Sequence, residues 1–422
     1  MGNFGSLRWR GNGSSTTPQR SRYYGATGRF SSDAPGCTRS ESVATEQPFD
    51  VVVVGLGAIG SAALYHLAAR GARALGLEMF EPGHGFGSSH GHHRMIRKSS
   101  NQDDGYVPLA ERAFELWSAL ETESGQELLR QTGEIRLVQP DAAGSKRAQA
   151  EALQARGFLE VLDAAEVAER FPGCQLYDDM FATYEADAGF LWSERGIITH
   201  VAQARRHGAT VRTNTEVTGW QADGDGVRVT TAQGAYVADR LVLTTGPWAA
   251  ELLNGLELPF RVIRSVNGYF QPERPDRWTT EQGAPNFLLD VAEGSYYGIA
   301  SVDGIGVKIG RSATEWGTPT TARTIRRSID DEEIAMMRRA LERYLPGAAG
   351  SELARITCMC TYTVDDNFIV DRHPACERVL LGCGFSGRGY KFAPTMGEVL
   401  ADLALDGTTR HTIDFLAATR FQ

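Results

Sequence analysis

Lysine is scarce in this chain of 422 residues: among its 43 basic residues, only Lys98, Lys146, Lys308 and Lys391 are lysines. Acidic residues outnumber basic ones, and the formal net charge is −9. A surface that binds nucleic acid normally shows a basic excess, so we expect no nucleic-acid partner. No run of 18 apolar residues occurs, which argues against a membrane-spanning helix and a membrane partner.

Cysteine is also sparse. The six cysteines are scattered, without the density of a disulfide scaffold or the CxxC pairs of a zinc site. We therefore expect a reducing compartment and a cytoplasmic protein. Hydrophobic residues make up 42% and charged residues 23% of the chain, which is typical of a globular protein with a large core.

Residues 1–47 differ in composition from the rest. They are rich in Gly, Ser, Thr and Arg and have no acidic residue before Asp33. We interpret them as a disordered tail. An Arg- and Ser-rich leader that is poor in acidic residues also fits an organelle transit peptide, and this alternative stays open.

An ordered pattern begins at Phe49. A β-branched strand over 50–54 runs into a glycine turn, a helix over 62–70 and a second strand over 74–77 that ends at Glu78. In the GxGxxG turn, Gly55 permits a tight bend, Gly57 allows the backbone to approach a pyrophosphate, and Gly60 allows close packing of helix and strand. An acidic residue about 20 positions later is placed to bind a ribose. This succession of strand, glycine turn, helix, strand and acidic residue predicts a dinucleotide-binding site.

The glycine- and histidine-rich loop over 82–97 interrupts the βα alternation that a simple dinucleotide domain would continue. A long functional loop here favours a buried cofactor ring. Its histidines, His84, His90, His92 and His93, also suggest a metal site. However, His92 and His93 would point apart in an extended segment, so we expect no metal. A purely structural loop remains the other alternative.

Two of the four lysines lie in glycine-rich segments, Lys308 within 304–310 and Lys391 within 387–392. In a chain that otherwise uses arginine, a lysine at such a position indicates a need for a compact ammonium group. Its pKa shifts readily on burial, which suits a small anion or a developing negative charge.

Later segments complete the secondary-structure prediction. Alternating residues over 211–218, 226–230 and 235–237 predict antiparallel strands, and 240–246 predicts a buried strand. A helix should end near Leu345, with Asp330 or Asp331 as its cap. A strand over 379–383, a glycine turn over 384–389 and a helix over 395–405 follow.

With these motifs, the chain from about residue 49 to 422 resembles the monomeric sarcosine oxidase and N-methyltryptophan oxidase family of flavoprotein amine oxidases. The segments that carry the resemblance are the 55–60 turn, 87–97 with 106–109 and 116–117, 296–298 before Lys308, 358–371, and 384–392 with 397–398.

The resemblance implies an α/β fold: a Rossmann-like FAD-binding domain and a substrate domain with a mixed or antiparallel sheet. We assign residues 48–135, 190–255 and 355–422 to the first domain and 136–189 and 256–354 to the second. It also implies FAD as cofactor, bound by Gly55, Gly57, Ala58, Ile59, Gly60, Glu78, His90, Arg94, Val217, Cys358, Gly387, Gly389 and Lys391.

The same resemblance implies catalytic roles. Arg97 and Lys391 would pair with the substrate carboxylate, and Tyr297 would line the substrate pocket. Lys308 would lie on the opposite face of the flavin and stabilise the negative charge that arises as O2 is reduced. Arg94 would stabilise negative charge on the reduced flavin.

In this family a cysteine carries the FAD covalently, and the spacing to Phe368 selects Cys358. A shifted match to Cys360, or a buried structural role for Cys358, stays open. Three positions depart from the family: Ser312 and Arg388 replace histidines, and Cys360 replaces a tyrosine. All three should face or flank the substrate, so sarcosine itself is doubtful as the substrate.

The resemblance therefore implies oxidation of a secondary, N-methyl or N-alkyl, α-amino acid to an imine, with O2 reduced to H2O2, by a monomeric protein. Two alternatives remain. One is an FAD-dependent dehydrogenase that passes electrons to a quinone or a carrier protein, and the other is a flavin-binding protein without turnover.

Overall fold

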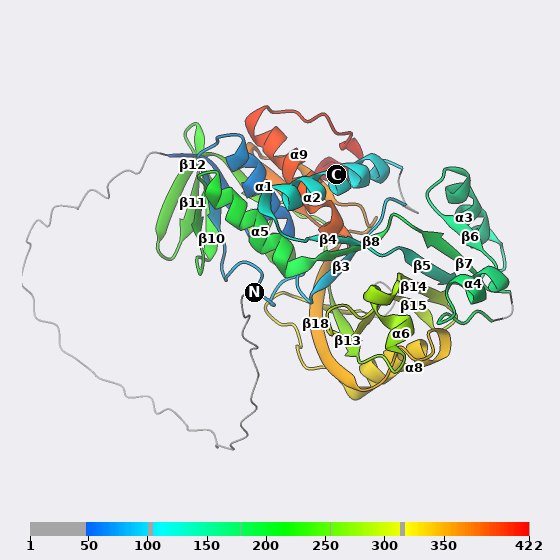
Figure 1. Cartoon of the computed structure of the whole chain (residues 1–422). Helices are drawn as coiled ribbons and strands as arrows, with labels where there is room; N and C mark the ends of the chain where they lie inside the picture. The colour runs from blue at the N-terminus through cyan, green and yellow to red at the C-terminus, as the bar shows by residue number, and fades with distance from the viewer. Residues whose placement is uncertain (1–47, 100–103, 178, 254, 313–316, 422) are drawn as a thin grey trace, which may run out of the picture. The chain divides into compact units, whose positions relative to one another are not determined.

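The computed structural model describes residues 48–99, 104–177, 179–253, 255–312 and 317–421 (Figure 1). The tail expected over 1–47 lies outside the described residues. Within them, three sheets form, of eight, nine and three strands. The predicted α/β class, a dinucleotide-binding sheet with a second mixed sheet, is confirmed.

The eight-stranded sheet has β1 (Phe49–Val54) at its centre, paired in parallel with β2 (Ala74–Leu77) and β12 (Gly234–Leu243). Val51, Val52, Val53 and Val54 are each at most 4% exposed. Alternate valines belong to two different apolar clusters, because successive side chains of a strand point to opposite faces. Burial on both faces explains the β-branched run.

Five further strands complete this sheet: β9 (Thr210–Arg212), β10 (Val217–Asp223), β11 (Gly226–Thr231), β19 (Ile369–His373) and β20 (Cys376–Cys383). Four helices bury their apolar residues in one cluster with alternate residues of β1, and Figure 1 shows them grouped together. They are α1 (Ala58–Ala69), α2 (Tyr106–Ser124), α5 (Ser193–Arg206) and α9 (Ala393–Leu405).

The nine-stranded sheet contains a long antiparallel pair, β13 (Arg261–Phe270) with β18 (Glu352–Tyr362). Its other strands are β5 (Glu134–Val138), β6 (Glu160–Leu162), β7 (Phe181–Glu185), β14 (Asn286–Val291), β15 (Gly294–Ile299), β16 (Val307–Arg311) and β17 (Thr318–Thr320). Shorter helices, α3 (Ser145–Ala155), α4 (Ala164–Arg170) and α6 (Pro275–Trp278), occur in the same part of the chain.

Helix α8 (Asp331–Tyr344) packs Ile334, Met337 and Leu341 into the core of this sheet. The predicted cap is confirmed: the main-chain N–H of Asp330 donates to Oε2 of Glu333 at 2.9 Å. The three-stranded sheet consists of β3 (His93–Ile96), β8 (Gly189–Trp192) and β4 (Leu129–Gln131).

One strand prediction was wrong. The segment 211–218 is not a single strand: it contains the end of β9 and the start of β10, which lie at opposite edges of the sheet. Asn214, with φ 52°, turns the chain between them. The strands predicted over 226–230 and 235–237 are confirmed as parts of β11 and β12. The division into two discontinuous domains stays a prediction.

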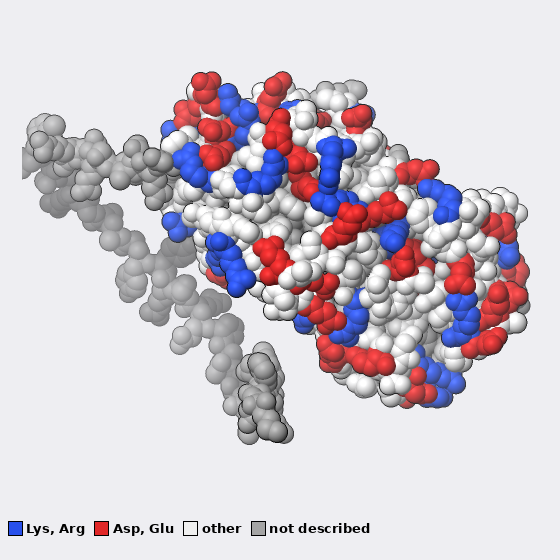
Figure 2. Space-filling view, turned by 45° about the horizontal axis from the view of Figure 1, so that its top comes forward, with Lys and Arg blue, Asp and Glu red and all other residues white. Residues whose placement is uncertain are grey.

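Charge of both signs is interspersed over the face of the described residues seen in Figure 2. No helix in the described part of the chain combines the length and the apolar character needed to cross a membrane.

Candidate functional site

The glycine turn connects β1 to α1, and its geometry explains two of its three glycines. Gly55 has φ 88°, and a Cβ there would lie 2.7 Å from the main-chain oxygen of Thr244. A Cβ at Gly60 would lie 1.8 Å from the main-chain oxygen of Gly55 and 2.3 Å from Oγ1 of Thr244. At Gly57 a Cβ would meet only Oγ of Ser89, at 3.9 Å, so the backbone is accessible there.

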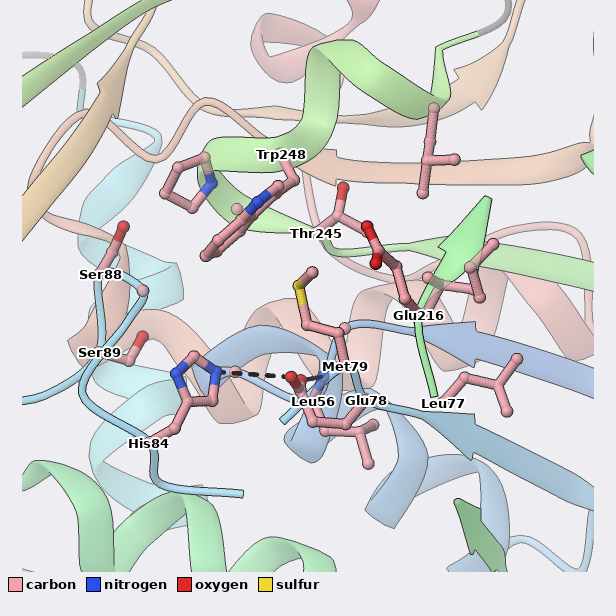
Figure 3. Close-up of a pocket in the computed structure, with 18 of the residues that line it drawn as sticks. Leu56, Leu77, Glu78, Met79, His84, Ser88, Ser89, Glu216, Thr245 and Trp248 are labelled. Carbon is pink, nitrogen blue, oxygen red and sulfur yellow. Dashed lines mark hydrogen bonds and ion pairs between the residues drawn. The ribbon is translucent and has the colours of Figure 1, made fainter. Parts of the chain in front are cut away.

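Glu78 follows β2 and is 4% exposed. Its Oε2 accepts from the main-chain N–H of Leu56 at 2.7 Å, and its Oε1 accepts from that of Phe80 at 3.0 Å. Nε2 of His84 lies 3.5 Å from Oε1, and a dashed line marks this contact in Figure 3. The carboxylate is thus fixed beside the glycine turn, where the sequence predicted a ribose-binding acid.

Two cavities meet beside this turn, and Ser88, Ser89 and Gly246 line both of them. The first, of about 830 Å³, is drawn in Figure 3. Its lining includes Gly55, Gly57, Glu78, Val217 and Trp248. The second cavity is larger, about 1450 Å³.

The larger cavity contains most of the other predicted site residues. Its lining includes Ala58, Ile59, Arg94, Arg97, Tyr297, Lys308, Cys358, Gly387, Gly389 and Lys391. The charged side chains on its wall are arginines and lysines, and no described Asp or Glu lines it. The structure therefore brings together residues from distant segments around a cationic cavity.

Lys308 lies on β16 and is 2% exposed. Its Nζ donates to the main-chain oxygens of Gly91 and His93, each at 2.9 Å. Burial, together with the charge of Arg94, lowers the pKa of Lys308 well below its usual value. Its ammonium is held by two carbonyl groups of the loop before β3.

Arg94 lies on β3 and organises the same loop. Its guanidinium donates to the main-chain oxygens of Ser88, His90 and His93 at 2.8, 2.6 and 2.8 Å. His90 is buried, and its Nε2 has no hydrogen-bond partner among the described residues. It is not part of either cavity wall.

Cys358 and Cys360 lie on one face of β18 and line the larger cavity. Sγ of Cys358 is 3.9 Å from Nη2 of Arg94 and 3.5 Å from the main-chain oxygen of Ser88. The Cys360 thiol, and then His90 and Arg94, hold the pKa of Cys358 well below its usual value although burial opposes this. The pKa of Cys360 is raised by Cys358 and by burial. Cys358 is therefore the stronger thiolate candidate.

Arg97 and Lys391 are the two predicted carboxylate ligands. Nη1 of Arg97 is 2.7 Å from Oε1 of Glu134, so its charge is partly offset. Lys391 lies in a short 3₁₀ turn, Gly389–Phe392, and forms no ion pair within the described residues. Burial, and next the charge of Arg97, lower the pKa of Lys391 to about 7. Together they present positive charge with which a carboxylate would pair.

Tyr297 lies on β15, and its hydroxyl donates to Oδ1 of Asn267 at 3.1 Å. It is also 3.4 Å from Oγ of Ser265. Ser265 and Asn267 on β13 line the cavity, and neither was predicted from the sequence. The sequence feature that could have indicated them is a pair of polar residues at alternate positions of a largely buried strand.

The three departures from the family pattern lie in or beside this cavity. Cys360 and Arg388 line it. Ser312 lines a smaller neighbouring cavity that shares Ser265 with the larger one. Gly387 has φ 71°, and a Cβ there would lie 2.7 Å from Oη of Tyr362, which requires glycine.

The loop histidines have separate environments. His84 lies by Glu78, and His93 is buried against Phe190 and Trp192. Among the described residues, no three His, Cys, Asp or Glu side chains are grouped as metal ligands.

These residues fit a dinucleotide with a ring system at one end. The glycine turn leaves backbone accessible where phosphates would lie, because a Cβ at Gly57 would meet only Oγ of Ser89, at 3.9 Å. The buried carboxylate of Glu78 lies beside it, and the cationic cavity suits an electron-rich ring and an anionic substrate.

Comparisons with known proteins agree with this geometry. Residues 50–403 match the family model described as FAD dependent oxidoreductase. Monomeric sarcosine oxidase from Streptomyces avermitilis is 41% identical over 372 residues, which cover 86% of this chain and 96% of that protein. N-methyl-L-tryptophan oxidase from Salmonella dublin is 32% identical over 381 residues, with 88% and 99% coverage.

A solved structure of NikD, described as an unusual amino acid oxidase essential for nikkomycin biosynthesis, is similar with a TM-score of 0.78. It is 24% identical and covers 88% of this chain and 98% of its own. This likeness shows a shared fold.

Proposed function

The chain belongs to the FAD dependent oxidoreductase family, and from this premise we propose that it oxidises a secondary, N-methyl or N-alkyl, α-amino acid to an imine while O2 is reduced to H2O2. The predicted resemblance to the sarcosine and N-methyltryptophan oxidases is confirmed by relatives at 41% and 32% identity over most of the chain. The observation that carries the proposal is the cationic cavity next to the nucleotide site, with no acidic residue on its described wall.

FAD, when bound, supplies the two-electron chemistry. Gly55 to Gly60 and Glu78 would hold its nucleotide part, and Cys358 would be its covalent attachment point. The thiolate character that Cys360, His90 and Arg94 give to Cys358 supports this attachment.

The protein's own contribution is placement. Arg97 and Lys391 bind the substrate carboxylate, which fixes the amine and lowers the barrier by proximity. Tyr297, oriented by Asn267, forms part of the wall beside them. Substrate binding adds a negative charge next to Lys391, which raises its pKa and keeps it protonated.

Lys308 and Arg94 provide positive charge elsewhere in the same cavity. Both are fixed by main-chain carbonyl groups before any reaction takes place. Such preorganised charge stabilises negative charge that exists only transiently, including that on oxygen during its reduction. This role of Lys308 favours an oxidase over a dehydrogenase.

An anaerobic screen of N-alkyl and cyclic amino acids for bleaching of the flavin tests the function. We expect at least one N-methyl amino acid to bleach it fully and to yield stoichiometric H2O2 when O2 is readmitted. A substoichiometric yield of H2O2 would favour the dehydrogenase, and no bleaching by any compound would favour the flavin-binding protein without turnover.

We also propose that the protein acts as a monomer in the cytoplasm. The word "monomeric" in the names of the sarcosine oxidase relatives supports the first part. The described cysteines are free thiols, as a reducing compartment favours.

A further inference from the structure

Arg388 is a cation of the larger cavity to which the proposed reaction gives no role. It directly precedes the 3₁₀ turn Gly389–Phe392, three residues before Lys391. Both side chains line the cavity, and both Arg97 and Arg388 lower the pKa of Lys391. Three cations are therefore close together.

The other cations already have partners. Arg97 pairs with Glu134, and Lys308 and Arg94 donate to main-chain carbonyl groups. Arg97 and Lys391 together account for one substrate carboxylate. No described acidic side chain lines the cavity, although Glu134 and Glu185 behind its wall favour the charged form of Lys391.

Arg388 itself makes few polar contacts. Its Nη2 donates to the main-chain oxygen of Asp366. The guanidinium lies over the rings of Tyr106 and Phe368, 5.6 and 5.8 Å from their centroids. The Asp366 carboxylate is near enough to raise its pKa, yet burial lowers the pKa overall, and no ion pair of the described residues includes Arg388.

This geometry leaves most of the guanidinium donors available. A guanidinium carries five donors in a planar fork that matches a carboxylate, and the contacts with the rings of Tyr106 and Phe368 do not use these donors. A neutral substrate side chain would cover these donors without satisfying them, which is unfavourable for a partly buried charge. An anionic side chain would satisfy them.

We propose that Arg388 binds a second carboxylate of the substrate, so that the preferred substrates are N-methyl or N-alkyl α-amino dicarboxylic acids. Lys391 and Arg97 hold the α-carboxylate, and Arg388, which lines the same cavity, holds the side-chain carboxylate. The inference rests on the proposed function and narrows its substrate class.

The first test compares N-methylglutamate with N-methylglutamine, which has nearly the same shape but a neutral side chain. In the wild-type holoenzyme we expect kcat/KM for the acid to exceed that for the amide by about 10- to 100-fold, the range for a charge-assisted hydrogen bond. In Arg388→Gln this ratio should fall to about one, and in Arg388→Lys to an intermediate value. Arg206→Gln, at an exposed arginine of α5, is the matched control and should keep the wild-type ratio.

The second test measures binding without turnover. (Methylthio)succinate and (methylthio)acetate carry sulfur in place of the amine, and changes in the flavin absorption spectrum report their dissociation constants. We expect the dicarboxylate to bind more tightly than the monocarboxylate, and Arg388→Gln to remove the difference.

An acid-to-amide ratio near one in the wild-type enzyme would overturn the proposal, whether or not the variants fold. An equal loss for both substrates in Arg388→Gln would also overturn it, because it would indicate a packing role on Tyr106 and Phe368. If no N-alkyl amino acid reduces the flavin but (methylthio)succinate binds through Arg388, the proposed function fails and the binding site stands.

Discussion

Nζ of Lys308 donates to the main-chain oxygen of Gly91 at 2.9 Å, so a buried ammonium on β16 is held by the loop that precedes β3. Oη of Tyr269 donates to the same oxygen at 2.8 Å. The N–H of Gly91 donates to Oε1 of Glu194 at 2.6 Å, and Glu194 favours the charged form of Lys308. Although burial opposes it, the positive charge of Lys308 is thus stabilised by the carbonyl group of Gly91 and by Glu194, which binds the N–H of the same glycine.

Replacing Lys308 by Met should slow reoxidation of the reduced enzyme by O2 by about 100- to 1000-fold, because preorganised positive charge is lost where negative charge develops. Stopped-flow absorbance should show a much smaller effect on anaerobic reduction. Lys146→Met, at a partly exposed lysine paired with Asp290, is the control and should change neither step. Equal slowing of both steps in Lys308→Met would contradict the role in oxygen reduction.

Replacing Cys358 by Ala should release the flavin on acid precipitation, leaving a colourless pellet and a yellow supernatant. Wild-type protein should give a yellow pellet. Cys383→Ala removes another buried thiol, on β20, and should keep the pellet yellow. A yellow pellet from Cys358→Ala together with a colourless one from Cys360→Ala would move the attachment to Cys360.

Replacing Gly60 by Ala should destabilise the protein by about 1–3 kcal/mol or more and reduce its FAD content. The added Cβ would lie 1.8 Å from the main-chain oxygen of Gly55, so the contact between turn and helix must open. Thermal unfolding and flavin absorbance measure both effects. Gly219→Ala, on β10, is the matched control because its Cβ meets nothing within 4 Å. Wild-type stability of Gly60→Ala would refute the packing argument.

The lowered pKa of Lys391 predicts that the free energy of unfolding depends on pH. Its pKa is lowered from 10.5 to about 7, so between these values the unfolded chain holds a proton that the folded protein lacks. The contribution of Lys391 to the free energy of unfolding therefore rises with pH across this window. Lys391→Met should raise the free energy of unfolding at pH 7 and flatten its pH dependence, as measured by urea unfolding from pH 7 to 10. Lys98→Met, at a surface ion pair with Asp187, should do neither.

The same titration affects ligand binding. A carboxylate ligand binds the protonated form of Lys391, so the dissociation constant of (methylthio)acetate should increase as the pH rises above about 7. Spectral titrations between pH 6 and 9 measure this constant. In Lys391→Met binding should be weaker and nearly independent of pH in this range; an unchanged profile would show that another group controls binding.

The nucleotide half of the site could be predicted from the sequence because its signals are local. β1, the glycine turn, α1 and β2 follow one another within about 30 residues, and Glu78 ends the unit. The prediction of a single strand over 211–218 was wrong for a local reason as well. An alternating pattern does not report the left-handed turn at Asn214, which sends the two halves to opposite edges of the sheet.

The larger cavity could be predicted only through the family resemblance. Arg94, Tyr297, Lys308, Cys358 and Lys391 come from five separate elements, and no periodicity in the chain indicates that they meet. The residues that support them were missed. Glu134 binds Arg97 across 37 positions, and no spacing rule connects them.

Ser88, Ser89 and Gly246 form the junction between the two cavities, and this has a consequence for how long a bound cofactor stays. A molecule that occupies both cavities passes through that junction. Arg94 fixes one side of it by binding the main-chain oxygens of Ser88 and His90. In a protein without the bond to Cys358, such as Cys358→Ala, dissociation would require these hydrogen bonds to break while the loop opens, so the loop would set the rate of release rather than the affinity of either cavity alone.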